Sequence, residues 1–255
     1  MPINFRCGRL LLLGLLFFES RAWGQTDEIQ VYDAEIVSQG HWNLTWHNNY
    51  TPSGRELPDF PGGVVPDHTL NGVPEWAYGV RDWFELGAYV PIYSLTGGGQ
   101  LLFDGVKLRT LFVVPHAAER RFFYGINFEY SYNRPQWDTH RYSGEIRPIV
   151  GVHLGHLDLI VNPILDTEYN GPSNLSFAPA ARVAYNFNER LAFALEQYSD
   201  FGPIKHFVPT SQQSQTLFAV VDLGTSANGI ELGVGYGLTA ASDSVVIKLM
   251  LMHDF

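Results

Sequence analysis

Charged side chains recur at every second position in several short segments, which places them on one face of a β-strand. Lys107 and Arg109 are separated by one residue, and so are Glu145 and Arg147. The signs largely alternate between successive segments, and adjacent strands lie about 4.8 Å apart, so charges on neighbouring strands could pair as a ladder. The full set is Glu85, Lys107, Arg109, Glu129, Glu145, Arg147, Asp166, Arg182, Glu196, Asp222, Glu231 and Lys248. If the strands close into a barrel with these side chains inside, the set is a luminal charge ladder. We expect such a ladder to be a structural network, a filter for solutes in a pore, or both.

Two pairs of residues that contain histidine are candidates for catalysis or metal binding. Hydrolysis of lipids needs a serine nucleophile beside a histidine. His140 and Ser143 are the nearest such pair, but a spacing of three residues puts them on opposite faces of a strand. His153 and His156 could bind a metal only with additional acidic ligands. The sequence therefore predicts no catalytic, metal or cofactor site, no cofactor, and a protein that is not an enzyme.

The elements that must carry the charges are segments in which apolar residues alternate. A membrane strand of about ten residues shows one face to lipid and the other to the lumen, so its sequence alternates in this way. The last segment alternates strictly, has Lys248 among its inward positions and ends on the aromatic Phe255. The twelve segments are 42–50, 70–80, 84–92, 106–112, 124–130, 142–152, 157–161, 181–187, 191–196, 215–223, 230–236 and 245–255.

Connections between these segments alternate between short and mostly longer ones, as in outer-membrane barrels with short periplasmic turns and longer external loops. The sequence thus predicts an all-β, up-and-down transmembrane antiparallel β-barrel of about twelve strands, with both termini in the periplasm. Twelve strands leave a lumen on the order of 10 Å wide, too narrow for an open general porin.

Four prolines set apart the first long connection, 51–67, which we expect to fold over the mouth as a lid or to be a rigid surface loop. Pro148, Pro163 and Pro179 fall inside predicted strands, where each removes a donor from the ladder. We expect bulges or strand ends at these three positions.

The N-terminus has the form of an export signal. Arg6 and Arg9 precede an apolar stretch, and a small-x-small site ends at Gly24. We predict a signal peptide over 1–24, a periplasmic arm or plug segment over 25–40, and an outer-membrane barrel over 41–255.

Composition narrows the class of protein further. The only cysteine, Cys7, falls within the predicted signal, so the mature chain has no thiol for disulfides or thiolate chemistry. The mature chain would carry 13 basic and 25 acidic side chains. Such an acidic chain is a poor partner for nucleic acid.

Aromatic residues gather near the ends of the predicted strands, as the two interfacial girdles of a membrane barrel require. They are Trp42, Trp76, Trp83, Tyr93, Phe122, Phe123, Tyr132, Trp137, Tyr142 and Phe187.

Several stretches, among them PEWAYGVRDWFELGAYVP (74–91), FDGVKLRTLFVVP (103–115), GINFEYSYNRPQWD (125–138) and FAPAARVAYN (177–186), resemble a proteobacterial outer-membrane family. That family is labelled as a MetA-pathway of phenol degradation protein and is often called a transporter. The resemblance spans most of the mature chain. It implies uptake of small, aromatic molecules across the outer membrane and supplies no catalytic residues.

The sequence thus favours a channel or transporter for small solutes in the outer membrane of a Gram-negative cell. The alternatives are a lipid-modifying outer-membrane enzyme and a non-conducting structural barrel. Expected partners are outer-membrane lipid, a small-molecule solute, and the barrel-assembly machinery, which would bind the C-terminal strand ending in Phe255.

Overall fold

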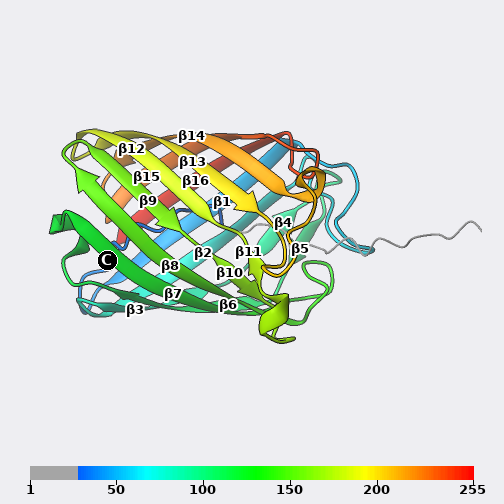
Figure 1. The fold of residues 1–255 in the computed structure, drawn as a ribbon, viewed down its shortest axis with the longest axis horizontal. Helices are drawn as coiled ribbons and strands as arrows, with labels where there is room; N and C mark the ends of the chain where they lie inside the picture. The colour runs from blue at the N-terminus through cyan, green and yellow to red at the C-terminus, as the bar shows by residue number, and fades with distance from the viewer. Residues whose placement is uncertain (1–27) are drawn as a thin grey trace, which may run out of the picture.

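The computed structural model describes residues 28–255, so the predicted signal peptide and residues 25–27 lie outside the described residues. Twelve long antiparallel strands form a barrel that closes where β1 pairs with both β2 and β16 (Figure 1). The strands are β1 (Trp42–Ser53), β2 (Leu70–Arg81), β3 (Phe84–Tyr89), β6 (Val106–Val113), β7 (Phe122–Tyr132), β8 (Tyr142–Leu154), β9 (Leu157–Asn162), β12 (Ala180–Asn188), β13 (Leu191–Asp200), β14 (Ser214–Gly224), β15 (Asn228–Gly237) and β16 (Val245–Asp254). The predicted fold class and strand number are confirmed.

Shorter elements lie at the end of the barrel that has the long connections, with one exception. They are β4 (Tyr93–Leu95), β5 (Leu101–Phe103), β10 (Leu165–Thr167), β11 (Ser176–Phe177), and the 3-10 turns η2 (Pro172–Asn174) and η3 (Thr210–Gln212). The exception, η1 (Ala117–Glu119), lies in a connection at the opposite end, where the C-terminus also lies (Figure 1). None of the helices in the described part of the chain is long and apolar enough to cross a membrane.

Alternation sets the two faces of the wall. In β16, Val246, Lys248 and Met250 are buried inside the barrel, whereas the residues between them are part-exposed on the outside. Leu108 and Val234, in other strands, are about half exposed in the same outward position. The outside of the barrel is therefore a continuous apolar surface, as contact with lipid requires.

The aromatic girdle prediction was wrong at two positions. Phe123 is fully buried inside the barrel, because it follows the outward-facing Phe122 in the same strand and so points the other way. Trp137 is buried against Val73 and Ile92 instead of lying at the membrane interface.

The segment 84–92 is not a single strand, contrary to the prediction. β3 ends at Tyr89, and Ile92 is 2% exposed instead of facing lipid. Pro91 has no N–H group, so the ladder cannot continue through it. The connection that follows folds into the β4–β5 hairpin, which pairs with β2 and extends the wall at the long-loop end.

Two of the three strand prolines lie at strand ends, as predicted. Pro163 lies between β9 and β10, and Pro179 between β11 and β12. Pro148 lies in the middle of β8 without a register shift, so the expectation was wrong there. The common register of β8 with β9 and β10 places Pro148 opposite Pro163. Both residues lack an N–H group, so the two donors that these prolines remove are missing at one level of the ladder.

The proline-rich connection between β1 and β2 folds across the long-loop end. Arg55 pairs with Asp243 in the β15–β16 connection, 3.1 Å away, and the Val64 N–H donates to the Gln136 carbonyl at 3.1 Å. Burial raises the pKa of Asp59, although its partner Arg55 pulls that pKa down. The loop is thus tied to two other connections and shields part of the mouth from water.

Candidate functional site

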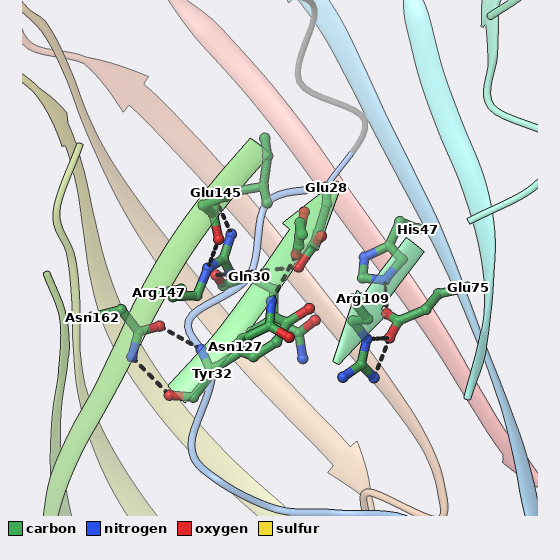
Figure 2. A network of polar contacts seen from close by, with 12 residues as sticks. Glu28, Gln30, Tyr32, His47, Glu75, Arg109, Asn127, Glu145, Arg147 and Asn162 are labelled. Atoms are coloured by element: carbon green, nitrogen blue, oxygen red, sulfur yellow. Dashed lines mark hydrogen bonds and ion pairs between the residues drawn. The ribbon is translucent and has the colours of Figure 1, made fainter. Parts of the chain in front are cut away.

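The most informative feature of the interior is the stretch of chain that precedes β1. Residues 28–41, called here the lumen segment, run inside the barrel from the long-loop end to the short-turn end (Figures 1 and 2). At the short-turn end the Gly40 N–H donates to the Gly79 carbonyl at 2.7 Å. A Cβ atom at Gly79 would lie 2.3 Å from the Val37 carbonyl oxygen, so this close passage requires glycine. The described part of the predicted arm therefore lies in the lumen.

Asn162 on β9 holds the lumen segment through its backbone. Its side-chain oxygen accepts the Tyr32 N–H at 2.7 Å, and its amide donates to the Tyr32 carbonyl at 2.9 Å (Figure 2). The Tyr32 hydroxyl lies 2.7 Å from the Tyr89 hydroxyl on β3. All three side chains are at most 6% exposed, so these buried hydrogen bonds fix the segment to two separate strands of the wall, β9 and β3.

Arg147 on β8 is a second anchor. Its guanidinium donates two hydrogen bonds to Glu145, at 2.6 and 2.9 Å, and a third to the Gln30 carbonyl at 3.1 Å. It also lies 4.4 Å from the ring centroid of Tyr32, in cation–π contact, and 3.5 Å from Glu28. A single arginine thus binds the wall and the lumen segment together.

Apolar packing completes the seat of the lumen segment. Val31, Tyr32 and Ala34 are buried in one cluster with inward side chains of the wall. The wall residues are Leu111, Val113, Ala117, Phe123, Ile149, Ile160, Ile164 and Ala180. One side of the interior is therefore a hydrophobic core, and the segment is part of it.

Arg109 is the centre of the first group of luminal charges. It donates to Glu85 and to Glu75, each at 2.5 Å, and His47 lies 3.0 Å from the other oxygen of Glu75. Glu85 also accepts the Val37 N–H at 2.6 Å, which ties this group to the lumen segment. All four wall side chains are buried (Figure 2 shows Arg109, Glu75 and His47).

Lys248 and Arg182 form the second group on the opposite side. The Lys248 ammonium lies 2.5 Å from Glu196 and 2.5 Å from Glu231, and donates to the Ile29 carbonyl at 3.3 Å. Arg182 pairs with Glu196 and Asp222, and lies 3.4 Å from Glu231. Lys248 is fully buried.

The remaining ladder residues lie nearer the long-loop end. Lys107 lies 3.4 Å from Glu129, which accepts a hydrogen bond from Asn127 at 2.9 Å. Asp166 on β10 is in register with Glu145 on β8. The predicted ladder residues therefore lie inside the barrel, but they gather in groups around the lumen segment and do not form one continuous ladder.

The lumen segment lines two cavities inside the barrel. The cavity at the long-loop end, about 410 Å³, is lined by Glu28 and Gln30 of the segment. The cavity at the short-turn end, about 440 Å³, is lined by residues from Gln30 to Val37. We call them the long-loop cavity and the short-turn cavity. Gln30 of the lumen segment lines both cavities.

The structure keeps His140 and Ser143 apart. Ser143 lines the long-loop cavity and accepts a hydrogen bond from Asn133 at 2.8 Å. His140 lies 3.1 Å from Glu168 in a separate surface pocket with tyrosines. A serine and a histidine on different faces cannot act as nucleophile and base.

The turn histidines have protein partners of their own. His153 lies 2.5 Å from Asp158, and the ring of His156 lies 2.7 Å from the Asn186 carbonyl. No group of three or more histidine or carboxylate side chains in residues 28–255 is placed to hold a metal ion.

Several residues at the centre of the interior were missed from the sequence. Polar Asn43, Thr45, His47 and Asn49 alternate with apolar or outward residues in β1, so the period of two could have revealed His47. Glu75 is the charged member of a weaker alternation in β2. Nothing in the sequence indicated the roles of Glu28, Tyr32 and Asn162, because the lumen segment forms no ladder.

The closed twelve-stranded antiparallel barrel has the fold of bacterial outer-membrane barrels. The COG4313 outer membrane channel from Pseudomonas putida F1 is similar over 89% of this chain and 100% of its own, with a TM-score of 0.57 and 12% sequence identity. LpxR from Salmonella typhimurium covers 83% of this chain and 99% of its own, with a TM-score of 0.43 and 8% identity. A porin from Rhodopseudomonas blastica covers 84% and 99%, with a TM-score of 0.29 and 12% identity.

The similarity to the Pseudomonas putida channel supports the fold of the chain. No family model matches the sequence, and no curated protein matches it either. The likeness to the phenol-degradation family therefore stays a resemblance that these comparisons do not confirm.

Proposed function

We propose that this protein is an outer-membrane channel for small solutes in which the lumen segment controls passage. The observation that carries this proposal is that the lumen segment lines two cavities, one toward each end of the barrel. A structural barrel has no need of a cavity at each end, whereas a solute route needs both. Movement of the segment would join the cavities into one path through the lumen.

The proposal extends to location and orientation. The apolar outer face, the fold and the predicted signal peptide support an outer membrane, with the short turns in the periplasm and the long connections outside. The luminal charges would select among solutes, because charged rings in narrow pores discriminate by electrostatics. The resemblance to the phenol-degradation family supports aromatic compounds as one class of solute.

An enzymatic role has less support than a channel. A lipid hydrolase would need a serine and a histidine together on one surface, and the candidates lie on different faces. A permanently closed structural barrel differs from the proposed channel in one measurable property, which is conductance.

Substitution of the anchor Asn162 tests the role of the segment. Asn162→Ala removes both hydrogen bonds to the Tyr32 backbone, so we expect more frequent opening and a severalfold higher open probability in single-channel recordings. Asn170→Ala is the matched control, because Asn170 is exposed, donates to Glu168 in the same external connection and lines neither cavity. Silent bilayers with wild type and Asn162→Ala alike would favour the structural barrel.

We also propose that the C-terminal strand is the part of the chain that the barrel-assembly machinery binds. Phe255 continues β16, faces outward at 56% exposure, and pairs through its backbone with Trp42. We expect deletion of Phe255 to lower the amount of folded barrel in the outer membrane severalfold while the precursor is still exported. Heat-modifiable migration in gels measures the folded fraction, and Phe255→Trp, which keeps a terminal aromatic, is the control. Equal folded fractions for the deletion and for wild type would refute this role.

A further inference from the structure

The long-loop cavity is strongly acidic. Nine carboxylate side chains and three basic side chains line it. The basic groups already have partners: Arg55 pairs with Asp243, Lys107 with Glu129, and Arg147 with Glu145. The cavity therefore has an excess of negative charge that the protein itself does not neutralise.

Two of these carboxylates have no basic partner. Asp166 projects from β10 and Asp200 ends β13, and neither takes part in an ion pair among residues 28–255. Asp200 accepts only a backbone hydrogen bond from Gly202, at 2.8 Å. Two carboxylates in one partly enclosed space repel each other, and either a proton or a nearby cation relieves that repulsion.

A third carboxylate points independently to a ligand. The side chain of Glu28 is 2% exposed and lines the same cavity. Its Oε1 atom lies 3.5 Å from Arg147, but its Oε2 atom has no hydrogen-bond partner in the described structure. A buried carboxylate oxygen without a donor is costly, and a ligand with N–H groups would satisfy it.

The remaining lining decides what kind of cation fits. The carboxylates do not converge closely enough to hold a metal ion within the described chain. Ile164, Phe218 and Val246 add apolar surface to the cavity, and Tyr198 adds an aromatic ring. A volume of about 410 Å³ is within the usual range for small-molecule sites. Separate carboxylates beside apolar surface suit an organic ammonium ion.

We infer that the long-loop cavity binds small organic cations, with the ammonium group hydrogen-bonded to the Oε2 atom of Glu28 and attracted by the negative charges of Asp166 and Asp200. Its apolar part would lie against Ile164 and Phe218. This inference rests on the proposed function, because the long-loop cavity would be the first part of the channel that a solute enters. It names small organic cations as the class of solute. Binding can nevertheless be measured without transport.

A matched pair of probes tests the sign of the charge. Benzylammonium and benzoate have similar size and opposite charge, and titration calorimetry on the whole detergent-solubilised protein measures both. We expect benzylammonium to bind at least about tenfold more tightly than benzoate, which is about 1.4 kcal/mol. We expect Glu28→Gln and Asp200→Asn each to weaken benzylammonium binding by about the same factor. Equal affinities for the two probes would overturn the inference.

The control variant is Glu119→Gln, which removes a carboxylate from η1, an exposed turn outside the cavity. Its affinity for benzylammonium should equal that of wild type. If Glu119→Gln weakens binding as much as Glu28→Gln does, net charge and not a site is responsible, and the inference fails. Folding of each variant is checked by heat-modifiable migration, and Asp200→Asn tests the site again if Glu28→Gln does not fold.

Bilayer recordings separate this inference from the proposed function. Under a KCl gradient, the reversal potential should show a preference for K⁺, and benzylammonium added on the long-loop side should reduce the current. Binding of benzylammonium without any conductance would sink the channel and leave the cation site. Conductance without preference for either charge, and without benzylammonium binding, would sink the cation site and leave the channel.

Discussion

Deletion of residues 28–39 is expected to raise single-channel conductance by at least about threefold, because it merges the two cavities into one open lumen on the order of 10 Å wide. The barrel itself should survive, since the segment makes no strand pairs and β1 begins at Trp42. Arg147, Glu85 and Asn162 would lose their contacts with the segment. Each lines a lumen that water would then fill, so water would replace the lost partners. Planar-bilayer recording of the deletion beside wild type measures the effect.

A second variant separates occlusion from anchoring. Replacement of residues 28–39 by a glycine–serine linker of the same length keeps chain in the lumen but removes the side chain of Tyr32, with its hydrogen bond to Tyr89 and its contact with Arg147, and the packing of Val31. We expect frequent brief openings from the linker variant and a steady high conductance from the deletion. If both variants conduct as wild type does, the segment does not limit passage and the proposed gate is wrong.

The wall of this barrel could be predicted because each of its strands has the same period of two. Alternation placed Lys248 inward and beside Glu231, and the two side chains do pair. The prediction failed near Pro91, where β3 ends earlier than the alternation indicated. It also failed at Phe122 and Phe123, because the sequence does not show which of two adjacent aromatic residues faces lipid.

The centre of the site could not be predicted because its parts follow no period. The lumen segment packs as an irregular chain, held by an asparagine and two tyrosines that look ordinary in sequence. Asn162 stands where a strand ends, and only the fold brings it to Tyr32, 130 residues away. Contacts of this kind depend on which strand lies opposite which, and this is decided by closure of the whole barrel.

The charge groups and the lumen segment also depend on each other. Lys248 donates to the Ile29 carbonyl, Arg147 to that of Gln30, and Glu85 accepts from Val37. The same side chains form the luminal network and hold the segment. The ladder can therefore be both a structural network and a filter for solutes. A network that is structural in the closed state would become the lining of the path once the segment moves.

The largest effect on stability should come from Lys248→Met, which leaves Glu196 and Glu231 without their shared ammonium partner. Breaking one member of a buried ion network typically costs about 3–5 kcal/mol, because the remaining charges stay buried. Arg182 contacts the same two carboxylates but also serves Asp222, so it can compensate only in part. Urea unfolding followed by tryptophan fluorescence, with the protein in lipid vesicles, measures the loss of unfolding free energy.

Two comparisons give this stability prediction its meaning. Lys205→Met removes an equal charge from an exposed external connection and should change the unfolding free energy by less than about 0.5 kcal/mol. The double variant Lys248→Met with Glu196→Gln removes one charge of each sign, and we expect it to recover more than half of the loss. If Lys248→Met is as stable as Lys205→Met, either water solvates Glu196 and Glu231 or Arg182 alone neutralises them. In that case the charges around Lys248 would not be needed for the stability of the barrel. Their remaining role would be to act on solutes that pass through the lumen.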